Sequence, residues 1–227
     1  MLETIGDLLP LAVATSLSPL PVIAMIILLT SSHARSATPA FLVGWMAAIA
    51  AAVVGFALLS ELGMGQRRGG VVGPIVKLVV GFFLLALAWW QWRQRPEPGE
   101  VAQLPRWLEA AQRMGPLQAA GLGFIIYAAN PKNLAVGLAA GVVFGSADLP
   151  LRQAAFVCAF YVLAGAVTVI VPVVGYLVAE QRVRPMLGEM RAWLTQNNFT
   201  LMAALLLVIG ALMVGKGISG LGAALRI

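Results

Sequence analysis

Six long apolar stretches alternate with polar gaps along the chain. Each stretch reaches the roughly 20 residues that a helix needs to cross the hydrocarbon core of a bilayer. Apolar blocks of this length are the primary signal of membrane-spanning helices. The pattern predicts an all-α integral membrane protein with six transmembrane helices, over residues 8–31, 39–62, 72–92, 118–145, 153–178 and 199–221.

The fourth stretch contains residues that a membrane helix normally avoids. Its segment "IYAANPKNLAVG", residues 126–137, places two asparagines, a proline and Lys132 inside an apolar run. Proline removes a backbone N–H donor and disrupts the turn before it. An ionisable residue within the bilayer is costly and indicates a functional site. We therefore predict a helix break at Pro131 with Lys132 as an intramembrane cation, unless the helix begins near residue 130 and Lys132 snorkels to the interface.

The first stretch carries a similar interruption, "TSLSPLPVIAMIILL". In both stretches a small polar residue precedes proline, as Ser18-Pro19 and Asn130-Pro131. Six helices divide into two sets of three, and an odd number gives the two sets opposite orientations, which is the geometry of an inverted-topology repeat. We predict one transmembrane domain, with repeat 1 over 1–92, a charged linker over 93–117 and repeat 2 over 118–227.

The two breaks together predict a substrate site. Backbone groups freed by a break in lipid must be satisfied by protein, water or substrate, and the helix N-termini that follow the prolines favour anions. Serine and asparagine side chains add donors and acceptors. The predicted substrate-binding residues are Ser16, Ser18, Pro19, Pro21, Asn130, Pro131, Lys132 and Asn133. Simple kinks at the prolines are the alternative interpretation.

Two further arginines, Arg35 and Arg152, precede the helices that follow the broken stretches. They are interpreted as loop anchors, or else as guards of the pocket mouth. Glu61 and Lys77 lie near the ends of apolar stretches and are interpreted as interfacial. The longest gap contains "PRWLEAAQRM", a predicted short amphipathic helix, and the fifth gap is a second mixed-charge, interfacial helix.

The composition supports a membrane protein and narrows its chemistry. Hydrophobic residues make up 60% of the 227 residues and charged residues 11%, with a mean hydropathy of +0.91, whereas soluble domains have about 45–50% and 25%. The net charge of +6 arises from basic residues in the gaps, where they anchor helices, so no nucleic-acid partner is expected. The single Cys158 excludes an intrachain disulfide or a multi-cysteine metal site. No metal or other cofactor is expected.

The distribution of Lys and Arg predicts the orientation of the chain. Gaps one, three and five contain eight, and the opposite side contains six. Because the cytoplasmic side carries the excess of positive residues, both termini are predicted outside. The N-terminal segment "MLETIGDLLP" lacks the basic n-region of a cleavable signal, so the first stretch is expected to remain as a helix.

The order of these motifs resembles a known family. The segments "SLSPLPVIAMIILLTSSHARSATPAFLVGW" and "AANPKNLAVGLAAG", with a charged central gap, resemble the glycopeptidolipid and sulfolipid-1 addressing proteins of actinobacteria, in the lysine-exporter superfamily. The resemblance implies two inverted three-helix repeats, often dimeric, in the bacterial plasma membrane. It also implies a role in exporting cell-envelope lipids or other small molecules. Its motifs cover only "SPLP" and "NPKN".

Three classes of function follow for the chain. A transporter of an anionic lipid or similar amphiphile is favoured, because Lys132 would attract a phosphate or carboxylate. An exporter of a small solute such as an amino acid, and a scaffold that assists a larger lipid exporter, are the alternatives. An enzyme is not expected, since the chain has one His, one Cys and no central pair of carboxylates.

Overall fold

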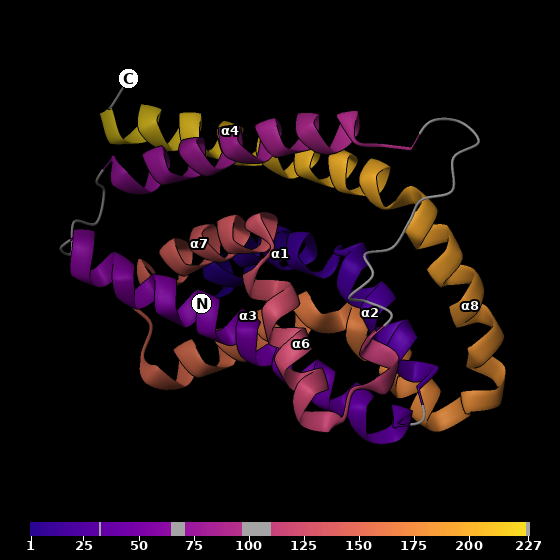
Figure 1. Ribbon diagram of the computed structural model, residues 1–227. Helices are drawn as coiled ribbons and strands as arrows, with labels where there is room; N and C mark the ends of the chain where they lie inside the picture. The colour runs from indigo at the N-terminus through magenta and orange to yellow at the C-terminus, as the bar shows by residue number, and fades with distance from the viewer. Residues whose placement is uncertain (32, 65–70, 97–109, 226–227) are drawn as a thin grey trace.

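A computed structural model describes residues 1–31, 33–64, 71–96 and 110–225 (Figure 1). All regular elements in these ranges are helices, as the apolar pattern predicts. The elements are α1 (Leu2–Ser16), α2 (Pro19–Leu29), α3 (Ala34–Met64), α4 (Val72–Arg93), the short 3-10 helix η1 (Ala111–Arg113), α6 (Pro116–Ala128), α7 (Pro131–Gly145) and α8 (Leu151–Leu225).

Both predicted helix breaks are present. The first apolar stretch is divided between α1 and α2, which are bent by 53°. The fourth is divided between α6 and α7. In each case two residues separate the helices and proline is the first residue of the second helix, a position where its missing N–H leaves no intrahelical bond unmade.

The number of membrane-spanning helices is smaller than the six predicted. By length and composition, four helical segments of the described chain could cross a bilayer, and five if α1 and α2 count as one bent span. The predicted span that this count does not include is the fourth. Its break leaves helices of 13 and 15 residues, each below the roughly 17–25 residues that a single spanning helix needs.

The fifth and sixth stretches form two candidate membrane spans within α8, Leu151–Val183 and Pro185–Leu225, and two helices join at a kink in this element. Within α8 only Ala179 leaves helical geometry, at φ −141° and ψ 50°, directly after the predicted end of the fifth stretch. The mixed-charge fifth gap is therefore helical, as predicted. Of the amphipathic helix predicted at 105–114, residues 105–109 lie outside the described residues, and the rest contains η1.

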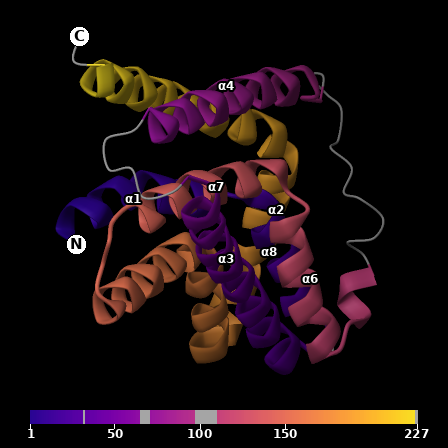
Figure 2. The ribbon, with the colours of Figure 1, turned by 90° about the vertical axis from the view of Figure 1, so that its left-hand side faces the viewer.

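The helices of the two halves of the chain pack against one another in crossed pairs. The helix α3 lies against α6 and α7, α1 and α2 lie against the first part of α8, and α4 lies against α8 (Figures 1 and 2). Glycines set the close approaches: a Cβ added to Gly123 of α6 would lie 2.3 Å from the Phe41 carbonyl oxygen of α3. Small residues at such crossings let backbones approach and gain van der Waals contact in lipid.

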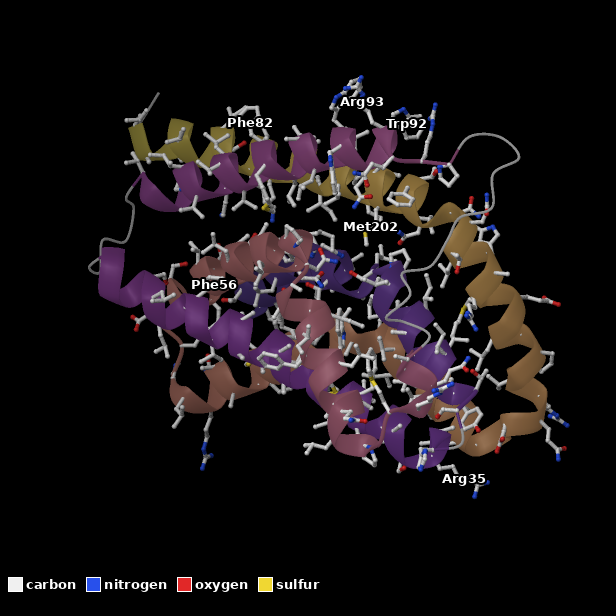
Figure 3. The ribbon with its side chains drawn as sticks, in the orientation of Figure 1. Arg35, Phe56, Phe82, Trp92, Arg93 and Met202 are labelled. Atoms are coloured by element: carbon white, nitrogen blue, oxygen red, sulfur yellow. The ribbon has the colours of Figure 1, made fainter. Side chains whose placement is uncertain are left out.

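The helix α4 and the last part of α8 run side by side as one layer, along the top of Figure 1. Gly81 of α4 packs on Val214 of α8, and Gly217 of α8 packs on Leu78 of α4. In Figure 3 the labelled Arg93 and Trp92 lie at the outer side of this layer, whereas Arg35 lies at the opposite edge of the molecule. The two broken pairs lie below this layer, in the interior of Figure 1.

Candidate functional site: two facing helix breaks

The break between α1 and α2 frees carbonyl groups at the end of α1. In an unbroken helix the Ser18 N–H would donate to the Ala14 carbonyl oxygen, four residues earlier. Here Ser18 N–H donates instead to Ser16 O at 2.8 Å. Because Pro19 has no N–H, the last turn of α1 must find other donors, and this turn is buried.

Lys132 of α7 supplies one of these donors. Its Nζ donates to Ala14 O at 2.8 Å, to Ser18 Oγ at 2.5 Å and to Leu17 O at 3.5 Å. The side chain is only 2% exposed. A cation at a helix C-terminus interacts favourably with the helix dipole, so Lys132 caps α1 from the other half of the chain.

Asn133 continues this network behind Lys132. Ser18 Oγ donates to Asn133 Oδ1 at 3.3 Å, and Tyr127 donates its hydroxyl to Asn133 O at 3.3 Å. Asn133 is fully buried, and its Nδ2 has no hydrogen-bond partner among the described residues. An unpaired buried donor is unusual in a folded protein, so this N–H can donate to a further polar group.

The helix α8 also contributes to the site, and no sequence motif predicts this contribution. Thr168 Oγ1 donates to Ser16 O at 2.5 Å, and the Tyr161 hydroxyl lies 3.1 Å from Thr15 Oγ1. A threonine or tyrosine on a membrane helix carries no pattern that marks its partner, so only the packing of α8 on α1 reveals these contacts. The first break is thus held from both α7 and α8.

The break between α6 and α7 has a different environment. Asn130 caps α7 locally, because its Oδ1 accepts from Lys132 N–H at 3.0 Å. Ala129 and Pro131 are exposed. Beside them lies a groove of about 460 Å³, lined by Leu20, Gln91, Leu122, Ile125, Ile126, Ala129, Asn130 and Pro131. It is mostly apolar, and the buried Gln91 Oε1 has no hydrogen-bond partner in the described part of the chain.

The structure brings most predicted site residues together. Ser16, Ser18 and Pro19 form the first break, Pro21 is buried in the next turn of α2, and Asn130 to Asn133 form the second. Arg35 and Arg152 do not join them. Arg35 is 85% exposed and lies 3.7 Å from Glu180 in an ion pair, and Arg152 is exposed at the start of α8.

Lys132, Ser18 and Asn133 form the polar centre of the site, which has the chemistry of a binding site for an acceptor-rich group. It offers a buried ammonium, a serine hydroxyl and an unpaired amide N–H, and the ammonium is bonded to neutral protein oxygens. Within the residues described, no three His, Cys, Asp or Glu side chains gather as metal ligands would.

The amino-acid sequence matches a known protein family. A family model described as Sap, sulfolipid-1-addressing protein, matches residues 8–219. The chain belongs to the sulfolipid-1-addressing protein family. The match includes both breaks and every residue that contacts Lys132, so the polar centre lies within the region that this family shares. No curated protein and no solved structure matches the chain. Family and helices together indicate a multi-pass membrane protein in lipid export.

Proposed function

We propose that this protein exports a cell-envelope lipid or other anionic amphiphile across the bacterial plasma membrane, by alternating access around its two helix breaks. The observation that carries the proposal is the contact of Lys132, in the second break, with Ala14 and Ser18, in the first. A single buried cation joins the two discontinuities, and movement of one half against the other must break its bonds.

The proposal includes two inverted three-helix repeats of the type found in the lysine-exporter superfamily. Each half has a proline-broken pair followed by two long helical segments: α3 and α4 in the first half, and Leu151–Val183 and Pro185–Leu225 in the second. The crossed packing of α3 on α6 and α7, and of α8 on α1 and α2, supports this relation. Broken helices at equivalent positions are where such transporters bind substrate.

An anionic headgroup can replace the protein oxygens around Lys132. The ammonium now bonds to Ala14 O and Ser18 Oγ, both neutral, and charge-assisted bonds to an anion are stronger than these. A sulfolipid, the lipid in the family's name, carries such an anionic group. The apolar groove beside Pro131 would take part of its hydrocarbon chain, since its volume lies in the roughly 300–1,000 Å³ range of ligand pockets.

An accessory scaffold is the second candidate, because one observation favours it. Lys132 Nζ already bonds to three oxygens of α1 and the residues after it, and these bonds are sufficient for a residue that holds two helices together. Either proposal includes a location in the plasma membrane with both termini on the outer side. Either also includes a homodimer and cooperation with larger lipid-export machinery.

The test is lipid movement in liposomes that contain only the purified protein. The probe is an acyl-labelled sulfated glycolipid, and the matched control is the same glycolipid without its sulfate group. We expect the protein to move the sulfated probe between leaflets and to move the neutral one at least tenfold more slowly. Transfer of neither probe would favour the scaffold, and export of labelled lysine from loaded liposomes would favour a small-solute exporter.

Two variants distinguish the role of Lys132 in substrate binding from its role in helix packing. Lys132→Met removes the cation, and Thr168→Val removes another side chain that donates to the first break but carries no charge. We expect Lys132→Met to abolish movement of the sulfated probe and Thr168→Val to retain it. Equal activity of Lys132→Met and the unchanged protein contradicts the proposed role of the cation.

A further inference from the structure

The groove beside Pro131 contains a polar side chain to which the proposed export cycle gives no role. Gln91, in the last turn of α4, lines this groove of about 460 Å³. Its Oε1 atom is buried and has no hydrogen-bond partner in the described part of the chain. Buried acceptors without a partner are rare in folded proteins, and each requires an explanation. A ligand that brings its own donor into the groove would supply the missing bond.

The rest of the groove is suited to a hydrocarbon chain. Its walls are apolar side chains of α2 and α6 together with Pro131, and Asn130 is the other polar residue that lines it. Ile125 of α6, one of these wall residues, is 61% exposed. The groove is therefore open at the outside of the helix bundle, where a lipid chain can enter from the membrane.

The end of α4 indicates the depth of Gln91 in the membrane. Gly73–Arg93 is a candidate membrane span, and Gln91 lies two residues before its end. Trp90 and Trp92, its neighbours in the sequence, are 54% and 44% exposed. Exposed tryptophans beside a terminal arginine are typical of the level of the lipid headgroups. Gln91 therefore lies where a lipid has the linkage between its headgroup and its hydrocarbon chains, and the groove extends from there to Pro131.

We propose that the groove binds a membrane lipid whose linkage region carries a hydrogen-bond donor, an amide N–H or a hydroxyl, and that Gln91 accepts from this donor. The hydrocarbon chain then lies along the apolar walls towards Pro131. A half-turn about the last side-chain bond of Gln91 exchanges Oε1 and Nε2, so the oxygen can face the groove without a change in the backbone. An ester-linked lipid has only acceptors in its linkage region and leaves this oxygen unpaired.

Gln91 is thus a specificity-determining residue, separate from the cation of the polar centre. Under the proposed export function, on which this step rests, the groove holds the lipid before its headgroup reaches Lys132. Binding in the groove does not itself require transport. The choice between lipids at Gln91 can therefore be measured apart from their movement across the membrane.

The test is competition between two lipids for the purified full-length protein, measured by native mass spectrometry. Both lipids carry the same sulfated galactose. One has it on ceramide, which contains an amide N–H and a hydroxyl, and the other on diacylglycerol, which contains neither donor. We expect about tenfold preference for the ceramide lipid, since a factor of ten is about 1.4 kcal/mol and lies within the typical net contribution of one hydrogen bond. Methylation of the ceramide hydroxyl identifies the donor: a retained preference assigns the amide N–H, and a lost preference assigns the hydroxyl.

Two variants locate the preference in the groove. Gln91→Met keeps an unbranched side chain and removes the acceptor, so the preference should disappear. Gln94→Met, the same change at an exposed position of the same helix end outside the groove, should keep it. Ile125→Trp places a larger side chain at the groove and should weaken the binding of both lipids. An unchanged preference in Gln91→Met, or unchanged binding of both lipids to Ile125→Trp, contradicts the proposal.

Lys132→Met distinguishes a failure at the groove from a failure of the proposed function. This variant should lose lipid movement in liposomes and keep the preference for the ceramide lipid in the binding experiment. If the unchanged protein shows the preference but moves no lipid, the export function is wrong and the groove site stands. If it moves both lipids at equal rates and binds them equally, the role of Gln91 is wrong and the export function stands.

Discussion

The two helix breaks have nearly the same backbone and opposite surroundings. The residue before each proline is extended, with φ −116° and ψ 110° at Ser18 and φ −91° and ψ 112° at Asn130. Ser18 is 2% exposed and bonded to Lys132 and Asn133 from the other half. The side chain of Asn130 accepts from Lys132 N–H at the start of its own helix, and its neighbours line an apolar groove.

This difference shows that local sequence and tertiary packing decide separate properties of a break. A polar residue followed by proline favours the end of one helix and the start of another, although Thr38-Pro39 lies within α3 without a break. Which break is sealed depends on the side chains that reach it from elsewhere. Under the proposed export cycle, the structure corresponds to a state in which the first break is closed by protein donors and the second is open to the groove.

Among the variants that test this difference between the two breaks, replacement of Lys132 should have the largest effect on the free energy of unfolding. Lys132→Met keeps an unbranched side chain but leaves Ala14 O buried without that donor. We expect a loss of about 2 kcal/mol in the free energy of unfolding, since an unsatisfied buried polar group costs about 1–3 kcal/mol. The measurement is an SDS titration in mixed micelles. An equally stable variant would mean that the first break does not need the cation.

Alanine at the two equivalent N-cap positions, Ser18 and Asn130, should distinguish the two breaks directly. Ser18→Ala removes an acceptor for Lys132 and a donor to Asn133 in the interior, so we expect a loss of about 2 kcal/mol. Asn130→Ala removes one local cap, which is typically worth about 1 kcal/mol, and water from the groove can replace it. The same titration checks both variants. A larger loss for Asn130→Ala would reverse the assignment of the sealed break.

A smaller effect is expected from the contact that α8 makes with the first break. Thr168→Val keeps the shape of the side chain and removes its bond to Ser16 O. That carbonyl oxygen still accepts from Ser18 N–H, so the expected loss is about 1 kcal/mol, a typical net value for one hydrogen bond. Thermal unfolding followed by tryptophan fluorescence measures it. A loss as large as that of Lys132→Met would make α8, rather than α7, the main support of the break.

The sequence predicts the breaks well and their environment poorly. Ser18-Pro19 and Asn130-Pro131 locate both breaks because capping and proline chemistry act over a few residues. Lys132 is buried, but no local pattern shows that its ammonium reaches Ala14, 118 residues away. Thr168 and Tyr161 were missed for the same reason.

The smallest effect should follow from replacing the proline of the open break. Pro131→Ala restores an N–H at the first position of α7, where no intrahelical acceptor exists. Pro131 is exposed beside the groove, so water can accept from this N–H, and we expect a change within about 0.5 kcal/mol, as for most surface substitutions. The break should persist, because Lys132 and Asn133 still tie the start of α7 to α1 and Ser18.

Pro19→Ala is the matched variant at the closed break. Pro19 is buried, so its new N–H would lack water, and the free energy of unfolding should fall by about 1 kcal/mol or more. Parallel SDS titrations of the two variants give the difference. If Pro131→Ala is the more destabilising of the two, the proline itself maintains the second break, and the tertiary bonds of Lys132 are secondary to it.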